Sequence, residues 1–281
     1  MLQMQLVALK KNRTMKLYTT LLIATAMTAL SAAQTLSIKG SDTLGAKLIP
    51  QLAEKFKAEG HAAVKFEIAA EGSSTAFPAL ANGTAQIGMS SRKANEKEIT
   101  DCKTKGVTLV EHAICFDMMC VIVNKTSTLT NLTKSQVAKI FTGQVTDWSE
   151  MRGAPGSISI YTRNTSSGTY KDWQKMAMDG RDYSDRSLKM AGTEQIVQEV
   201  VNNAGGIGYV GLAFAKARGI KVLTIDGIAP TAETKKTYAY SRECYLYLPE
   251  KATAEAATFL EFVKSGSAQH IVTSTGFIHA N

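Results

Sequence analysis

The sequence has 281 residues, 44% of them hydrophobic and 20% charged, with only 5 prolines. These proportions are typical of a globular protein and exclude a disordered, collagen-like or low-complexity chain. The formal net charge of +8 would suit a protein that binds nucleic acid, but four basic residues within the first sixteen positions supply half of that excess. We therefore expect no nucleic-acid partner.

The first 33 residues have the pattern of an export signal. Basic residues at 10–16 precede an apolar run at 21–30, and small residues at 31–33 suit cleavage before Gln34. The apolar run is too short to span a membrane. We expect a signal peptide at 1–33 and a soluble protein of the periplasm, where the redox environment is oxidising.

Three units of strand, turn and helix follow the signal. Apolar spacing predicts strands at 35–39, 64–69 and 85–89, and helices at 44–57, 76–81 and 96–103. This repeated order is typical of a parallel α/β sheet, whose turns meet at the carboxyl ends of the strands.

The pattern changes after residue 107. Two long strand-like runs, 110–123 and 237–248, are each long enough to leave one sheet and enter another. Between them we predict a second α/β series, and after them two closing helices. The predicted helices are 134–141, 170–178, 194–203, 252–264 and 268–274, and the strands are 157–161, 208–210 and 222–225.

Two long strands that flank an inserted α/β half predict two lobes joined by a hinge. Lobe I would comprise residues 34–115 together with the hinge return and second part at 237–281, and lobe II residues 116–236. A cleft between lobes is a common place for a ligand, so we expect one there.

The four cysteines are Cys102, Cys115, Cys120 and Cys244. In an oxidising compartment an even set favours buried structural thiols or a disulfide, and the spacing leaves the pairing open. The four histidines are scattered and none has ligand spacing with a cysteine. We therefore expect no metal, no cofactor and no cysteine–histidine catalysis.

Four turns are rich in serine and threonine. They are Ser41-Asp42-Thr43, Ser73-Ser74-Thr75, Ser90-Ser91-Arg92 and Ser166-Ser167-Gly168-Thr169. At a helix N-terminus such a turn aims free backbone N–H groups and hydroxyls at one point, although each turn alone also fits an ordinary N-cap. Arg92 and Arg163, in or beside these turns, favour a joint site for a small tetrahedral oxyanion, because a guanidinium binds an oxyanion bidentately.

Several motifs occur in the order found in one transport family. They are Asn131-Leu132-Thr133, Ile140-Phe141-Thr142-Gly143, Asp147-Trp148, Tyr161-Thr162-Arg163, Ser167-Gly168-Thr169, Gly205-Gly206-Ile207-Gly208-Tyr209-Val210-Gly211 and Ser241-Arg242. With them the chain resembles the PstS-like phosphate-binding proteins of the high-affinity phosphate ABC transporter. The resemblance implies a two-lobed periplasmic-binding-protein fold of type II, with mixed sheets flanked by helices and a hinge of two crossing strands. It also implies that the lobes hold one inorganic phosphate for delivery to a membrane ABC permease.

The resemblance assigns site residues by position. Arg163, Ser167, Gly168 and Thr169 match the family's Arg-x-x-x-Ser-Gly-Thr anion loop. The other positions come from the first two turns of the family or from the serine-rich turns of this chain. They are Ser41, Asp42, Thr43, Ser73, Ser74, Ser91, Arg92 and Ser166.

This chain departs from some members at two positions. Ser91-Arg92 stands where they carry a carboxylate, and Asn164-Thr165 stands where they carry an acidic residue that could orient Arg163. The acceptor of the phosphate proton is therefore open. Asp42 is the candidate, followed by Glu71, and an N-cap role for Asp42 is the alternative.

These features predict a monomeric binding protein without catalytic residues. Sulfate, molybdate or tungstate would satisfy the same donors and is the alternative ligand. A phosphatase-like hydrolase would need a nucleophile paired with a base, or a metal cluster, and the sequence shows no such spacing. A structural or adhesive envelope protein would have no need of arginine in a cap turn.

Overall fold

The computed structural model describes residues 35–280, and the predicted signal peptide at 1–33 lies outside the described residues. The described chain begins with parallel strands: β1 (Thr35–Gly40) lies between β2 (Lys65–Ala69) and β3 (Ile87–Ser90). The parallel pairing predicted from the repeated pattern is confirmed. The helices that follow these strands are α2 (Asp42–Gly45), α3 (Leu48–Phe56), α4 (Ser73–Ala81) and α5 (Glu96–Thr104).

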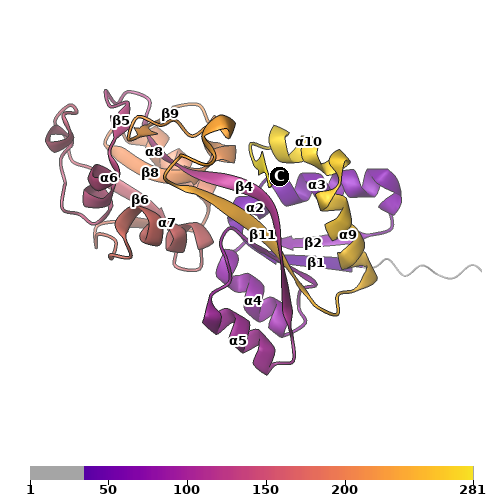
Figure 1. Cartoon of the computed structure of the whole chain (residues 1–281). Helices are drawn as coiled ribbons and strands as arrows, with labels where there is room; N and C mark the ends of the chain where they lie inside the picture. The colour runs from indigo at the N-terminus through magenta and orange to yellow at the C-terminus, as the bar shows by residue number, and fades with distance from the viewer. Residues whose placement is uncertain (1–34, 281) are drawn as a thin grey trace, which may run out of the picture. The chain divides into compact units, whose positions relative to one another are not determined.

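Two long antiparallel strands, β4 (Leu109–Asn124) and β11 (Ser241–Pro249), join this sheet to the rest of the chain (Figure 1). β11 lies between β3 and β4, which extends the first sheet in the order β2-β1-β3-β11-β4. The distal part of β4 leaves β11 and pairs with β8 (Gly206–Gly211) and β9 (Ile220–Val222). The prediction that the run at 110–123 passes from one sheet to another is confirmed.

The second half of the molecule is built on β4 and β8. β6 (Ser159–Arg163) lies parallel to β8 on one side and to β7 (Leu188–Met190) on the other. Its helices are α6 (Lys134–Phe141), α7 (Gly168–Met178) and α8 (Thr193–Asn202), and a small sheet pairs β5 (Asn131–Leu132) with β10 (Thr224–Ile225).

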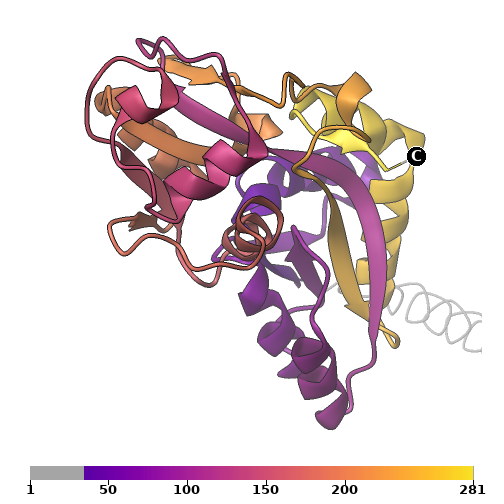
Figure 2. The same ribbon diagram turned by 60° about the vertical axis from the view of Figure 1, so that its left-hand side comes forward.

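The chain returns to the first half through β11. Figures 1 and 2 show α4 and α5 on one side of the β4–β11 ribbon and the last two helices on the other. The closing elements are α9 (Ala254–Lys264), α10 (Gly266–Ser274) and β12 (Ile278–His279), which pairs with β4. The helices in the described part of the chain include none that is both long and apolar enough to cross a membrane.

Each half has its own hydrophobic core. In the first, α3 packs on α9, and Phe56 lies edge-to-face with Phe259 at 5.3 Å between ring centroids. In the second, Trp173 stacks on Tyr209 at 4.5 Å. Burial of large aromatic side chains is strongly stabilising, so each half has a core of its own. β4 contributes buried residues to both cores, whereas the buried residues of β11 in these two clusters belong to the first.

Several predicted elements differ from the structure. The strand predicted at 222–225 is divided between β9, which ends at Val222, and β10, which begins at Thr224. The single helix predicted at 44–57 is broken into α2 and α3 at Lys47, whose φ of −135° is not helical. Its ammonium donates to Ala213 O at 2.9 Å and lies over the Phe214 ring, contacts that a continuous helix pattern cannot reveal. The second long run is shorter than predicted, since 237–240 form turns and β11 begins at Ser241.

Candidate anion-binding site

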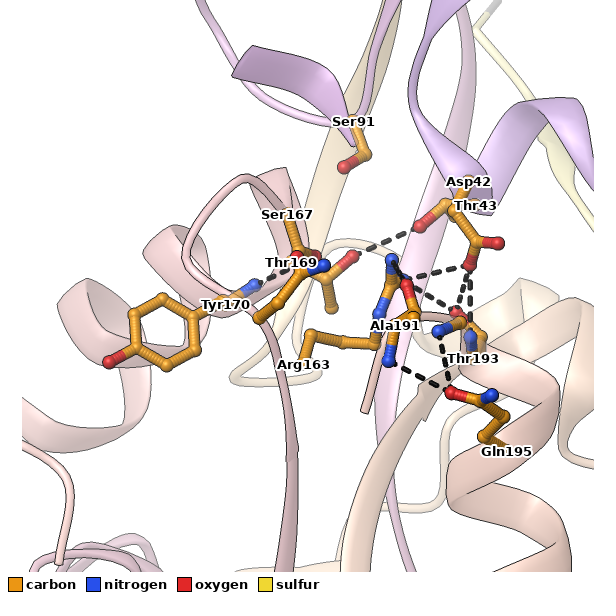
Figure 3. A network of polar contacts seen from close by, with 12 residues as sticks. Asp42, Thr43, Ser91, Arg163, Ser167, Thr169, Tyr170, Ala191, Thr193 and Gln195 are labelled. Carbon is orange, nitrogen blue, oxygen red and sulfur yellow. Dashed lines mark hydrogen bonds and ion pairs between the residues drawn. The ribbon is translucent and has the colours of Figure 1, made fainter. Parts of the chain in front are cut away.

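The predicted turns from the two halves meet at one place (Figure 3). Thr43 Oγ1 lies 3.0 Å from Thr169 Oγ1, and the Ser74 amide donates to Ser166 O at 3.1 Å. A Cβ atom added at Gly168 would lie 2.3 Å from Ser73 Oγ. Residues 90 or more positions apart in the sequence are thus packed against one another.

Glycines allow this close approach. Gly72, the N-cap residue of α4, has φ of +124°, and a Cβ atom there would lie 2.6 Å from Ser166 O. Gly168 has Ser73 Oγ and Ser91 Oγ where its side chain would be. A larger residue at either position would separate the two turns.

Helices α4 and α7 begin at the cluster of serine and threonine hydroxyls. α4 starts at Ser73 and α7 at Gly168, so both begin earlier than the predicted 76 and 170. Ser167 caps α7, because its Oγ accepts from the Tyr170 amide at 3.2 Å. First-turn amides have no acceptor within their own helix and carry the positive end of its dipole, which favours a bound anion.

The side chains around these helix starts are mostly buried hydroxyls. Ser91 N donates to Ser73 Oγ at 3.1 Å, and the two serine hydroxyls lie 3.3 Å apart. Ser41 Oγ is buried without a hydrogen-bond partner among the described residues. Of the predicted site residues with polar or charged side chains, those at most 3% exposed are Ser41, Thr43, Ser73, Ser91, Arg163, Ser167 and Thr169.

Arg163 supplies the positive charge. Its Nη1 donates to Asp42 Oδ2 at 2.8 Å and to Thr193 Oγ1 at 2.9 Å, and its Nη2 donates to Ala191 O at 2.7 Å. Its Nε is buried and, among the described residues, has no acceptor. Burial lowers the pKa of the guanidinium, while the Asp42 carboxylate opposes that shift. One N–H group of a buried cation is therefore available to an anion.

Asp42 lies between the halves. Within the described part of the chain its carboxylate accepts three hydrogen bonds, all on Oδ2: from Arg163 Nη1, from the Thr193 amide at 3.0 Å and from Thr193 Oγ1 at 2.6 Å. Thr193 is the first residue of α8, so the carboxylate also lies at the positive end of that helix. The Asp42 carboxylate thus orients the Arg163 guanidinium. The resemblance implied an acidic residue in the arginine loop for this role, where the present chain has Asn164-Thr165.

Three of the predicted side chains turn to other partners. Arg92 forms an ion pair with Glu98 at 2.6 Å and donates to Ser74 Oγ at 3.1 Å. Ser74 Oγ also accepts from Lys171 Nζ at 2.9 Å. Ser166 Oγ donates to Glu71 O at 2.9 Å. The serine-rich turns are in place, but these side chains face α5, α7 and the backbone rather than the central hydroxyls.

Arg242 and Thr193 are parts of the network that the sequence analysis did not assign to it. Arg242 is buried on β11, pairs with Asp117 at 2.9 Å and Asp172 at 3.2 Å, and donates to Thr169 Oγ1 at 2.9 Å. Burial by itself lowers the pKa of Arg242, but the two carboxylates outweigh it and the net shift is upward. A signal existed, because Asp117 interrupts an otherwise apolar run and a buried carboxylate needs a cation.

Residues 26–267 match the PBP superfamily domain. The phosphate-binding protein PstS of Bacillus subtilis is 32% identical over 250 residues, covering 88% of this chain and 81% of its own. The phosphate-binding protein PstS of Pseudomonas aeruginosa PAO1 is 31% identical over 269 residues, covering 86% and 82%.

Two solved structures of phosphate-transport proteins are similar to this chain over most of its length. A crystal structure of a substrate-binding protein with bound phosphate from Clostridium perfringens has a TM-score of 0.81 at 28% identity, covering 88% of this chain and 100% of that one. An ABC-type phosphate transport receptor from Vibrio cholerae has a TM-score of 0.71 at 26% identity, covering 86% and 99%.

Proposed function

Because the chain belongs to the PstS family of phosphate-binding proteins, with the two-lobed fold of the PBP superfamily, we propose that it captures inorganic phosphate between its lobes. It then delivers the phosphate to a membrane ABC permease. We further propose that it acts as a monomer in the periplasm after cleavage of residues 1–33, that it binds no nucleic acid and that it performs no catalysis.

One observation carries the proposal. Two helix N-termini, a shell of buried hydroxyls and the buried Arg163 converge where both halves contribute. Arg163 Nε and Ser41 Oγ have no hydrogen-bond partner there among residues 35–280. Neutral donors with a single cation can bind a small oxyanion by hydrogen bonds in place of its hydration shell. The site residues would be those predicted from the turns, with Arg92, Ser74 and Ser166 acting through their neighbours.

Binding would be coupled to closure of the lobes about β4 and β11. The contacts Thr43–Thr169 and Asp42–Arg163 each join a residue of the first half to one of the second. An anion that accepts hydrogen bonds from both halves binds the closed form more tightly than the open form and so shifts the population toward closure. The hinge would then lie where β4 and β11 leave the first core.

The acceptor of the phosphate proton would be a hydroxyl. Asp42 directs Oδ2 to Arg163 and Thr193, so we assign it the task of orienting Arg163. The family resemblance implies a carboxylate at Ser91-Arg92, and the Ser91 hydroxyl there can both donate and accept. A hydroxyl can turn to donate to sulfate, so the preference for phosphate over sulfate would be smaller than a buried carboxylate would give.

Calorimetric titration tests the proposal. The protein is titrated separately with phosphate, sulfate and molybdate at neutral pH. We expect saturable binding of one phosphate per chain and weaker binding of the other two. Tighter binding of molybdate or sulfate would favour the alternative ligand, and no binding of any of the three would contradict anion capture altogether.

A further inference from the structure

Two cysteines face each other on the strands that join the halves. Cys115 of β4 is directly opposite Cys244 of β11 in the antiparallel register, next to the bulge between Cys244 and Tyr245. Both side chains are 0% exposed. Cys244 is also among the groups that raise the pKa of the Cys115 thiol.

We propose that Cys115 and Cys244 form a disulfide that links β4 to β11 between the two lobes. Directly opposed residues of an antiparallel pair have Cα atoms roughly 4.5–5.5 Å apart. Disulfides need Cα atoms about 4.4–6.8 Å apart, so the bond forms without separating the strands. The structure holds the two sulfurs as free thiols, which is the reduced form of the pair.

The fold excludes the other pairings for these two residues. Cys120 lies five positions further along β4, about 16 Å away in an extended strand, and pairs with Val210 of β8. Cys102 belongs to α5 and packs with Phe77, whose carbonyl accepts from its thiol. The strand register therefore indicates the Cys115–Cys244 pairing, which the spacing of the cysteines in the sequence left open.

Formation of the bond is a two-electron oxidation. The two thiols give up two protons and two electrons and one S–S bond forms, while a disulfide oxidant, such as glutathione disulfide, accepts them and becomes two thiols. The exchange passes through a mixed disulfide. Such oxidants occur outside the cytoplasm, so in the cell the bond depends on the location assigned under the proposed function.

Oxidation should occur while the chain folds. Burial, the neighbouring Cys244 side chain and the charge of Asp117 raise the pKa of the Cys115 thiol in the folded protein. The thiolate, which is the attacking species, is therefore scarce once β4 and β11 have packed. Folded reduced protein would react slowly, and an oxidised protein would resist reduction in the same way.

The bridge lies beside the support of the anion loop. Asp117 lies two residues after Cys115, and Arg242 lies two residues before Cys244, so they are opposite each other in the same register. Arg242 in turn donates a hydrogen bond to Thr169 Oγ1. Alternate residues of a strand share a face, so the disulfide and this ion pair are neighbours. The bond would keep β4 and β11 in the register that places Arg242, while leaving the lobes free to move beyond it.

Refolding of the purified protein from denaturant tests the proposal without reference to its cellular location. The double variant Cys102→Ala/Cys120→Ala is refolded in a glutathione redox buffer, and free thiols are then alkylated under denaturing conditions. We expect both remaining thiols to be lost, with a mass about 2 Da lower than that of the reduced chain. The melting temperature should rise by roughly 5–15 °C relative to the reduced form.

The matched control is Cys115→Ala/Cys244→Ala, which should keep both of its thiols under the same conditions. In the wild-type chain, cleavage before Asp117 separates Cys115 from Cys120, so peptide mapping identifies the bonded residues. Free thiols in the first variant, or a bond that includes Cys102 or Cys120 in the wild type, would overturn the proposal. Phosphate titration of the reduced protein is a separate measurement, so failure of the bridge and failure of phosphate binding are distinguishable.

Discussion

Replacement of Asp42 by asparagine separates two tasks that a carboxylate at this position could perform. The asparagine side chain would keep the size and one acceptor oxygen, but it would remove the charge that pairs with Arg163 at 2.8 Å. A hydrogen bond to a charged group contributes about 1.5–3 kcal/mol and a neutral one about 0.5–1.5 kcal/mol. If Asp42 only orients Arg163, the closed form is destabilised by about 1–2 kcal/mol, and affinity falls about 5–30-fold for every oxyanion.

The assay is competition calorimetry of Asp42→Asn with phosphate and with sulfate. We expect both affinities to fall by a similar factor, so their ratio stays within about threefold of the wild-type ratio. Asp147→Asn is the matched control, because Asp147 is a cap residue away from the cluster whose oxygen accepts from the Ser149 amide, and it should leave both affinities unchanged. A fall in phosphate affinity at least tenfold larger than that in sulfate affinity would refute the orienting role and make Asp42 the proton acceptor.

Other changes give further expected outcomes. Arg163→Ala should weaken phosphate binding by about 2–5 kcal/mol, because a buried anion loses its cation, and titration within threefold of wild type would remove Arg163 from the site. Gly168→Ala should abolish tight binding, because its Cβ would lie 2.3 Å from Ser73 Oγ, whereas Gly266→Ala, which has nothing within 4 Å, should bind normally. Arg242→Gln should lower both the melting temperature and the affinity, since the buried Asp117 and the partly buried Asp172 lose their partner; an unchanged affinity would separate Arg242 from the loop. Small-angle scattering should show compaction on addition of phosphate, and identical profiles would argue against closure about β4 and β11.

The sequence predicts the bounds of a helix correctly where capping residues and apolar spacing within the helix itself determine its ends. The helix at 134–141 is predicted with its bounds correct, because Thr133 and Gln136 form a capping box and the apolar spacing is regular. The break between α2 and α3 could not be predicted, since it depends on contacts of Lys47 with Ala213 and Phe214, far along the chain. Tertiary contacts of this kind override helix propensity.

The site residues also divide into those that local sequence signals predict and those that depend on tertiary contacts. The cap turns and Arg163 are predictable because serine, threonine and glycine are favoured at helix N-termini, where backbone amides can bind an anion. The sequence places Arg92 in the same set, but Glu98, six residues later, pairs with its guanidinium. The joint role of Asp42 and Thr193, and the alignment of Cys115 with Cys244, are properties of strand register and lobe contact that no local pattern encodes.

A crystal structure of the protein grown with phosphate tests the central claim most directly. We expect one phosphate between α4 and α7, with an oxygen about 2.7–3.0 Å from Arg163 Nε and others in reach of the first-turn amides of both helices. The Asp42–Arg163 ion pair should be retained beside it. Phosphate bound elsewhere on the chain, or an Arg163 side chain that makes no contact with it, would contradict the proposed site.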